Sequence, residues 1–346
     1  MNNESKYSHA KPHWREYAEF ANRSSKKTAG ISALIGLVLI VIAAFIANAW
    51  RNDLPNYLAA HWDATGTPTR STSFGGYIAP WIIMGLVTLG LFTVVGRALG
   101  NQAMYRKWIA AMNVWTGLFC GTYLLTGLWF QRGVGDYPRA PLTTITVGLP
   151  LIVSILGLAL TWVIIPGDPP MPTTIPIPND AARIVLPSQQ RAVWHRRISG
   201  RKVLIIGTIG TLVILAMAYW LWNWALLLTA ILLMLLYFTM LAFSVRVDSG
   251  GLTVRSFLGW PRTHIPLNEV VRASVTTVNP VGDFGGWGWR AGLGGNRIGV
   301  ITRNGKALQV ERTGGRYFVI TTDDADGAAA LLNTFADLTR SPSETV

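Results

Sequence analysis

The chain has 346 residues, of which 50% are hydrophobic and only 14% are charged, a composition that excludes an ordinary soluble domain. The apolar residues gather in runs of roughly 19–23 residues, the length at which a helix crosses the hydrocarbon of a bilayer. The formal net charge of +13 does not indicate nucleic-acid binding, because ten of these charges lie in three segments beside alternate ends of the runs. This is the positive-inside pattern, and it predicts a cytoplasmic N-terminus.

Four apolar runs follow a basic N-terminal tail. Residues 1–28 are polar and basic with interspersed aromatic residues, which predicts a flexible cytoplasmic tail with a short interfacial helix. The first run follows this long tail and is of spanning length, so we expect an uncleaved anchor. Residues 29–165 are predicted to form the first membrane domain, with an exterior motif loop at 51–76. Its four spans are Ile31–Ala49, Tyr77–Val95, Trp108–Phe130 and Thr143–Ile165.

The third span carries two features of its own. Cys120 is the only cysteine, which excludes a disulfide or a cysteine-based zinc site within one chain. Gly117 and Gly121 have the small-xxx-small spacing that lets two helices approach closely. Ordinary glycine usage in an apolar helix and a contact between two copies of the chain both fit this spacing.

A proline-rich cytoplasmic loop is predicted at residues 166–200. Seven prolines lie in this loop, and its first part is predicted to be an extended, semi-rigid spacer. The second part places Trp194, His195 and a cationic cluster at the predicted membrane face, where anionic lipid headgroups are the expected partner. The cluster comprises Arg191, Arg196, Arg197, Arg201 and Lys202.

The next apolar run, Val203–Val245, is too long to cross the membrane once and must fold back. We therefore predict a transmembrane hairpin at 201–245 whose turn lies at Asn223. The result is six transmembrane helices with both termini inside, in a multi-pass protein of a bacterial cytoplasmic (inner) membrane. No Asp, Glu, Lys, Arg or His lies within the six predicted spans, which argues against a transporter.

Residues 246–340 change to an alternating apolar and polar pattern with turn residues, which predicts a β-rich cytoplasmic domain before a short tail at 341–346. The predicted strands are Ser244–Asp248, Leu252–Phe257, Arg262–Pro266, Ala273–Val278, Arg297–Thr302, Ala307–Glu311 and Arg316–Thr321. A closing amphipathic helix is predicted at Asp323–Leu338. Seven strands followed by one helix is the order of a pleckstrin-homology-like (PH-like) domain.

The stretch Leu54–Phe74 carries a short motif of Leu-Pro, His-Trp, Gly and Pro. It resembles the loop of the membrane family called domain of unknown function 1648. The matching residues are Leu54, Pro55, His61, Trp62, Gly66 and Pro68. Ala59, Asp63 and Thr69 depart from the family pattern, which commonly has Pro, Asn and Asp there. The family includes the sporulation-delaying-toxin immunity protein, so the resemblance implies a role in sensing or immunity.

The C-terminal region, including residues 300–332, resembles the bacterial PH-like domains of membrane proteins. This resemblance implies a cytoplasmic module that binds a lipid or a protein.

The exterior motif loop contains one candidate site, formed by His61, Trp62 and Asp63. These residues could bind a ligand or assist a metal ion, but one His and one Asp are too few for a closed metal site. In the alternative, the loop is a shaped lid that is stiffened by its prolines and turned at Gly66.

A glycine-rich loop in the β-rich domain is the second candidate site. Its residues are Phe284, Gly285, Gly286, Trp287, Gly288, Trp289 and Arg290. The two indole rings and the arginine could enter the headgroup region or bind a phosphate. In the alternative, the loop closes a hairpin and its tryptophans cover the core.

The sequence contains no catalytic motif, phosphate-binding loop or dinucleotide fingerprint, so we predict a non-enzymatic protein with no cofactor and no metal. The leading hypothesis is a sensing or immunity-like membrane protein with a PH-like module that binds lipid or protein. Its expected partners are the bilayer, anionic headgroups and a protein or peptide, without nucleic acid. The alternative is a membrane scaffold organised by the PH-like domain, and a transporter is less favoured than either.

Overall fold

The computed structural model describes residues 11–63, 65–100, 102–186, 192–220, 224–292 and 296–340, without the side chains of 11–18, 202 and 224–226. The chain divides into two compact units. The helical unit comprises Ala18–Asp168, and the β unit comprises Pro169–Val346 together with Met1–Tyr17.

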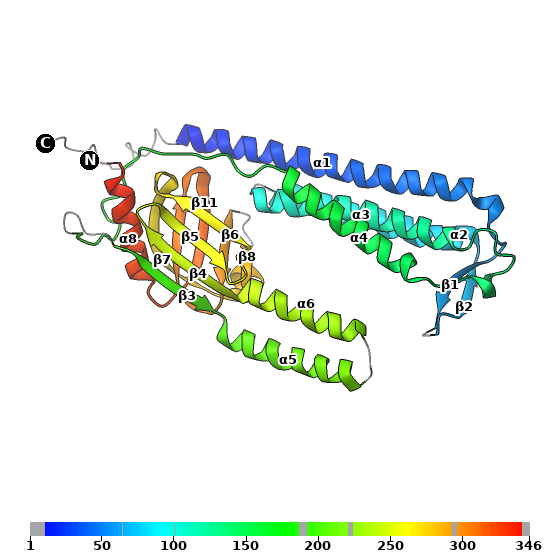
Figure 1. Cartoon of the computed structure of the whole chain (residues 1–346). Coiled ribbons are helices and arrows are strands. Elements are labelled where there is room, and N and C mark those ends of the chain that lie inside the picture. The colour runs from blue at the N-terminus through cyan, green and yellow to red at the C-terminus, as the bar shows by residue number, and fades with distance from the viewer. Residues whose placement is uncertain are drawn as a thin grey trace. The chain divides into compact units, whose positions relative to one another are not determined.

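Four long helices make up most of the helical unit (Figure 1). They are α1 (Lys11–Ala49), α2 (Phe74–Leu99), α3 (Ala103–Trp129) and α4 (Thr144–Ile164). Together with α5 (Arg201–Trp220), they are the five helices in the described part of the chain that are long and apolar enough to cross a membrane. This finding agrees with the prediction of a multi-pass helical membrane protein.

Helix α1 begins at Lys11, well before the predicted start of the first span at Ile31. Pro12 fits the first turn of a helix, where its missing N–H has no helical partner to lose, and no proline follows it within α1. The described part of the predicted flexible tail is therefore one continuous helix with the first span, not a tail with a short separate helix. Residues 1–10 lie outside the described part of the chain.

Helix α3 is the most buried helix of this unit. In its most apolar stretch 56% of the residues are buried, compared with 11% in α2 and in α4. Its glycines are the reason. A Cβ on Gly117 would lie 2.6 Å from the backbone of Gly36 in α1, and a Cβ on Gly121 would lie 3.3 Å from the Leu39 carbonyl oxygen. The small-xxx-small spacing therefore serves close packing of two helices within one chain.

The predicted exterior loop folds into a β-hairpin between α1 and α2. Its strands are β1 (Leu58–Trp62) and β2 (Pro68–Thr72), paired antiparallel. The two strands were not predicted, because each has only five residues. The register shifts between them further weaken the alternation of apolar and polar residues. Leu58 is fully buried and packs in one cluster with Ala47 of α1 and Leu128 of α3. The hairpin is thus anchored in the core of the helical unit.

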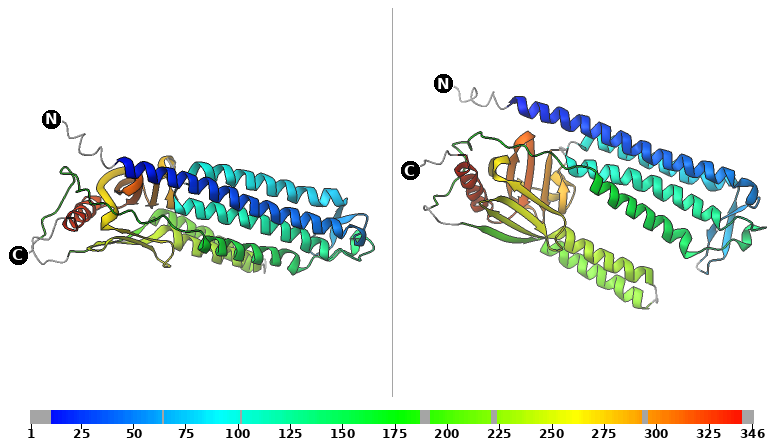
Figure 2. Two further views of the ribbon diagram at one scale, coloured as in Figure 1. Left: turned by 90° about the horizontal axis from the view of Figure 1, so that it is seen from above. Right: turned by 45° about the horizontal axis from the view of Figure 1, so that its top comes forward.

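Two sheets and the closing helix α8 (Ala325–Leu338) form the core of the β unit (Figures 1 and 2). The first sheet has the antiparallel order β3-β4-β5-β6, and the second has the order β7-β10-β11-β9-β8, in which β11 and β9 are parallel. The strands are β3 (Trp194–Ser199), β4 (Ala242–Asp248), β5 (Gly251–Ser256), β6 (Arg262–Pro266), β7 (Val270–Val278), β8 (Gly288–Ala291), β9 (Arg297–Ile301), β10 (Gly305–Arg312) and β11 (Arg316–Thr321). Helix α8 packs on the core that these strands enclose.

The seven predicted strands correspond to β4, β5, β6, β7, β9, β10 and β11. Two further strands, β3 and β8, lie in segments predicted as loops. Only Trp194 and Ile198 of β3 are buried, and the remaining residues of this edge strand are polar and exposed. The pattern therefore lacks the apolar alternation that indicates a strand. In β8 the alternation is also missing, because Trp289 is surrounded by glycines, which are uncommon in strands.

Helices α5 and α6 (Trp224–Leu241) are inserted between two paired strands. Ser199, the last residue of β3, lies opposite Ala242, the first residue of β4, and the Gly200 N–H donates to the Leu241 carbonyl oxygen at 3.1 Å. The chain therefore leaves the sheet and returns to it at adjacent points, as expected for a hairpin. Figures 1 and 2 show α8 at the opposite end of the sheets from α5 and α6. The predicted turn at Asn223 lies outside the described residues.

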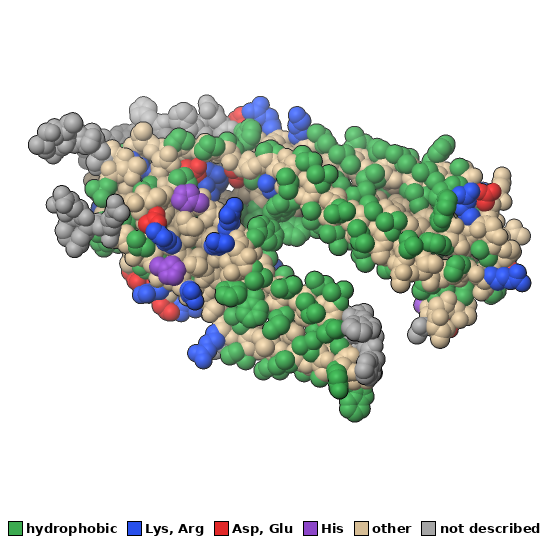
Figure 3. All heavy atoms as spheres, viewed as in Figure 1, with side chains coloured by type: hydrophobic (Ala, Val, Ile, Leu, Met, Phe, Trp, Pro, Cys, Tyr) green, Lys and Arg blue, Asp and Glu red, His purple; other side chains and the backbone are tan. Residues whose placement is uncertain are grey.

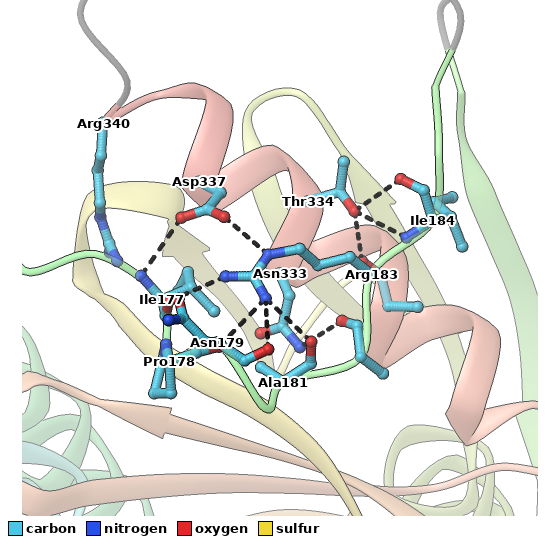
Figure 4. Close-up of polar contacts among 12 residues, drawn as sticks. Ile177, Pro178, Asn179, Ala181, Arg183, Ile184, Asn333, Thr334, Asp337 and Arg340 are labelled. Carbon is cyan, nitrogen blue, oxygen red and sulfur yellow. Dashed lines mark hydrogen bonds and ion pairs between the residues drawn. The ribbon is translucent and has the colours of Figure 1, made fainter. Parts of the chain in front are cut away.

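Residues 169–186, which we call the strap, run along α8 rather than forming a free spacer (Figure 4). Ile177 is 1% exposed and belongs to the core of the β unit. The Arg183 guanidinium pairs with Asp337 at 2.7 Å, and the Ile184 N–H donates to the Thr334 hydroxyl at 3.0 Å. Prolines favour an extended chain but do not determine whether that chain packs against the rest of the protein. Here the contacts with α8 hold the strap in place.

Candidate functional sites

Asp63 organises the turn of the β1–β2 hairpin. Its Oδ1 accepts hydrogen bonds from the Thr65 hydroxyl at 2.6 Å, the Thr65 N–H at 2.9 Å and the Thr67 N–H at 3.0 Å. Gly66 has a positive φ of 82°, which a glycine adopts readily, and the chain turns there as predicted. The bond from the Thr65 hydroxyl, with that from the Thr67 N–H next, holds the pKa of Asp63 below its ordinary value. The carboxylate therefore serves the fold of the turn.

The side chains next to Asp63 also have partners, and these partners differ. His61 Nδ1 lies 2.9 Å from the Thr69 hydroxyl on the neighbouring strand. The Trp62 Nε1–H donates to the Ala140 carbonyl oxygen at 3.0 Å. Within the described residues, no group of three or more His, Cys, Asp or Glu side chains is placed to hold a metal ion. The three residues do not converge, and their arrangement fits the alternative of a shaped lid.

Gln131, just after α3, attaches the hairpin to the helices. Its fully buried amide accepts from the Ala59 N–H at 2.7 Å and donates to the Ala59 carbonyl oxygen at 3.2 Å. It also donates to the Gly127 carbonyl oxygen at 3.1 Å. The amide thereby satisfies both backbone groups of Ala59, as a neighbouring strand would. The remaining motif residues are placed around it: Leu54 packs on the core of the helical unit, Pro55 precedes β1 and Pro68 begins β2.

Arg132 joins the ends of α1 and α3 beside the hairpin. Its Nη2 lies 2.6 Å from the Asp53 carboxylate, and its guanidinium lies 4.9 Å from the Trp50 ring centre and 5.1 Å from the Trp129 ring centre. An open depression is lined by Asp53, Trp129, Arg132 and Gly133. We call it the Trp129 depression, after the tryptophan that lines it, which is 55% exposed. It presents an aromatic face beside a charged pair.

The glycine-rich loop of the β unit divides into covered and exposed side chains. Phe284 ends the short helix α7 (Pro280–Phe284) and is buried. Trp289 packs between Phe243 and Phe318, with ring centres 6.0 Å and 5.6 Å away. These two residues follow the alternative in which the loop covers the core.

Trp287, by contrast, is 39% exposed, and Arg290 donates from Nε to the Trp287 carbonyl oxygen at 2.8 Å. The glycines allow this course of the chain. Gly285 and Gly286 have positive φ angles of 65° and 139°. Gly288 has a φ of 101°, and a Cβ on it would lie 2.8 Å from the Met240 carbonyl oxygen at the end of α6.

The described arginines of the predicted cationic cluster, Arg196, Arg197 and Arg201, are all exposed. Arg196 also lies 3.7 Å from Asp324 at the start of α8. Trp194 is not a membrane-face residue, because its ring is buried in the core and its Nε1–H donates to Asp324 at 2.9 Å. Arg191 and the Lys202 side chain lie outside the described part of the chain.

Three residues of the helical unit that matter here were not predicted from the sequence. Asp53 and Arg132 each follow the tryptophan at the end of a span, and this matching placement could have indicated their pairing. Gln131 is a single polar residue that belongs to no pattern, so only the folded chain reveals its bonds with Ala59.

Comparison of the chain with protein-family models, with curated proteins and with solved structures finds no match in any of the three.

Proposed function

We propose that the chain is a non-enzymatic, six-span protein of a bacterial cytoplasmic membrane that senses, or gives immunity against, an extracytoplasmic peptide. The observation that carries the proposal is the firmly held β1–β2 lid beside the Trp129 depression. Gln131 and Trp62 hold this lid on two sides, so the surface exists before any ligand arrives. An exposed indole next to an ion pair suits a peptide that combines apolar and charged side chains.

The six-span arrangement is supported by the insertion of α5 and α6 between β3 and β4. Because Ser199 and Ala242 are paired, the intervening chain has to return to the side from which it left. The 18 residues of α6 extend about 27 Å at about 1.5 Å per residue, close to the thickness of the hydrocarbon. With the positive-inside charges, this arrangement supports a cytoplasmic β unit and an exterior lid.

The order of the strands supports a PH-like β unit with two insertions. Strands β3, β4, β5, β6, β7, β10 and β11, followed by α8, give seven strands and a closing helix. The α5–α6 hairpin is one insertion, and the segment from α7 to β9 is the other. The sequence also predicted seven strands, but that set included β9 and lacked β3, and the described part of this unit has nine.

The strap is the segment of chain that connects the helical unit with the β unit. Within the helical unit, Asp168 accepts from the Ala103 N–H at 3.1 Å and pairs with Arg106 at 2.7 Å. Within the β unit, the Met171 N–H donates to Glu269 at 3.2 Å. Only Pro169 and Pro170 separate these two anchored residues along the chain.

The experiment that tests this function compares two tryptophans of α3. Cells that lack the protein are screened with membrane-active peptides and envelope stress, and then complemented with the wild type, Trp129→Ala or Trp108→Ala. Trp108 is a matched control, because it packs against Trp162 at the same 5.6 Å as Trp129 against Trp50. We expect only Trp129→Ala to lose protection at equal amounts in the membrane. Equal protection by both variants would contradict the proposal.

A membrane scaffold is the second candidate, favoured by the exposed side chains of the β unit. It predicts that Trp287→Ala disturbs the partners of the protein in the membrane while Trp129→Ala does not. Co-purification of partners with each variant separates the two functions.

A further inference from the structure

The outer face of the β3–β6 sheet carries a row of arginines that the sequence does not bring together. The register places Arg197 opposite Ser244, Ser244 opposite Arg255, and Arg255 opposite Arg262. Directly opposed residues of an antiparallel pair point to the same side of a sheet, so the three arginines share one face. All three are exposed. Figure 3 shows several blue and two purple side chains over this part of the molecule, with a few red ones among them.

This row carries positive charge that the fold leaves uncompensated. Like charges that are directly opposite destabilise a sheet, and adjacent strands are only about 4.8 Å apart. The described residues place no carboxylate within ion-pair distance of Arg197, Arg255 or Arg262, whereas Arg246 in the next row pairs with Asp248 at 2.7 Å. A bound anion would relieve the repulsion, and a guanidinium pairs with phosphate through two parallel hydrogen bonds.

The row lies at the end of the sheet from which α5 and α6 leave. Ser244 is two residues from Ala242, where β4 follows α6, a distance of about 7 Å along a strand. Arg201, at the first position of α5, is exposed at the same end. An arginine side chain in the row can therefore reach the headgroup level of a membrane crossed by these helices.

The β5–β6 turn at this end exposes large apolar side chains. Phe257 is 69% exposed, Leu258 50% and Trp260 52%. The Phe257 N–H donates to the Ala242 carbonyl oxygen at 2.9 Å, and its ring centre lies 5.9 Å from that of Phe238 in α6. The turn is therefore fixed to the helix at the point where the helix meets the sheet.

Arg255 links the row with the turn. Gly259 has a φ of 91°, and a Cβ on it would lie 2.9 Å from the Arg255 guanidinium. The guanidinium thus lies against the backbone of the turn. Charged and apolar groups follow one another at a single edge, in the order in which phosphate and hydrocarbon follow one another in a leaflet.

We propose that Arg197, Arg255 and Arg262 bind the phosphates of anionic phospholipids while Phe257, Leu258 and Trp260 enter the same leaflet. The occupant is the membrane that α5 and α6 cross, because the turn is continuous with α6. The inference rests on the proposed spanning of these two helices, and not on the Trp129 depression. It assigns the β unit a docked position that depends on lipid charge.

The test uses the full chain with Cys120→Ala, reconstituted in vesicles of phosphatidylcholine with or without phosphatidylglycerol. A fluorophore is attached at Leu258→Cys, and nitroxide lipids quench it where it meets the bilayer. Ser249→Cys is the matched control, since this exposed residue lies in the turn at the other end of β4. We expect quenching at Leu258→Cys that increases with phosphatidylglycerol, and little quenching at Ser249→Cys.

Charge variants then test the arginines. Arg255→Gln and Arg262→Gln should each lower the docked-to-undocked ratio in anionic vesicles about fivefold, and leave it unchanged in phosphatidylcholine. Quenching equal to that of Ser249→Cys, or quenching insensitive to both variants, would overturn the proposal. Loss of the lipid effect on addition of inorganic phosphate would also overturn it, because the ligand would then be a soluble anion.

A separate label identifies failure of the spanning arrangement itself. Tyr219 near the end of α5 is 81% exposed, and Tyr219→Cys should react with an impermeant maleimide only from the side opposite to Ser249→Cys. Reaction of both from one side would contradict the proposed span. If Tyr219→Cys and Ser249→Cys react from opposite sides but Leu258→Cys is not quenched, only the lipid site is contradicted.

Discussion

The β1–β2 hairpin and the outer face of the β3–β6 sheet both present polar side chains, but the fold uses them in opposite ways. In the hairpin, His61, Trp62 and Asp63 each have a partner within the helical unit. On the sheet, Arg255 and Arg262 lie opposite each other with no carboxylate in reach among the described residues. The side chains of a conspicuous motif can thus serve only to hold the fold together. Residues that are far apart in the sequence can meanwhile be brought together into a site by the register of the strands.

The largest expected effect concerns two tryptophans that are two residues apart. Trp289→Ala removes a ring packed between Phe243 and Phe318 and should lower the free energy of unfolding by about 3 kcal/mol. Trp287→Ala should change it by only about 0.5 kcal/mol, because that side chain is partly exposed. Denaturant unfolding of the purified chain, followed by near-ultraviolet circular dichroism, measures both. Equal losses would show that both rings belong to the core.

The next effect tests how firmly the hairpin is held. Gln131→Ala leaves the buried N–H and carbonyl oxygen of Ala59 without their partner, which should cost about 2 kcal/mol of folding free energy. Thermal unfolding in detergent measures the loss. Arg70→Ala on β2 is the control, since its side chain is exposed, and should shift the free energy by about 0.5 kcal/mol or less. If Gln131→Ala left the folding free energy unchanged, the lid would not be attached at Gln131.

A smaller, local effect depends on pH. Because the pKa of Asp63 is lowered in the fold, its contribution is present above the ordinary value of 3.8 and is lost as the pH falls through the lowered value. The amides of Thr65 and Thr67 should therefore exchange faster with solvent in acid. Hydrogen exchange between neutral pH and pH 3 measures this, after correction for intrinsic rates. Asp63→Asn should abolish the pH dependence, and its persistence in that variant would contradict the assignment.

The smallest expected effect is on the stability of the sheet. Arg255→Gln removes one of two directly opposed positive charges and should leave the free energy of unfolding unchanged or raise it by about 0.5 kcal/mol. The same denaturant series measures it. A loss of more than about 1 kcal/mol would place Arg255 among the structural residues, with His61 and Asp63.

The sequence predicted those parts of the fold whose pattern is long. Runs of apolar residues indicated the helices, and the fold-back of Val203–Val245 followed from its length alone. Strand β3 was not predicted, because Trp194 and Ile198 are its only buried residues. The sequence does not show which element these two side chains pack against. The strap escaped because its prolines fit a free or a bound chain equally well, and only Ile177 and Arg183 fix it.

The candidate sites were less predictable for the same reason. The motif at His61 to Asp63 was visible, but its use in the hairpin depends on Thr69 and Ala140, which the sequence does not place nearby. Arg255 and Arg262 were visible as charges, but their opposition depends on the register of β5 and β6.

The proposed topology puts the lid and the β unit on opposite sides of the membrane. Labelling of intact cells with an impermeant maleimide tests it most directly, using Arg70→Cys on the hairpin and Ser249→Cys in the β4–β5 turn, both with Cys120→Ala. Both positions are exposed in the fold. We predict that Arg70→Cys reacts in intact cells and that Ser249→Cys reacts only after the membrane is permeabilised. Reaction of both in intact cells, or of neither before permeabilisation, would contradict the account.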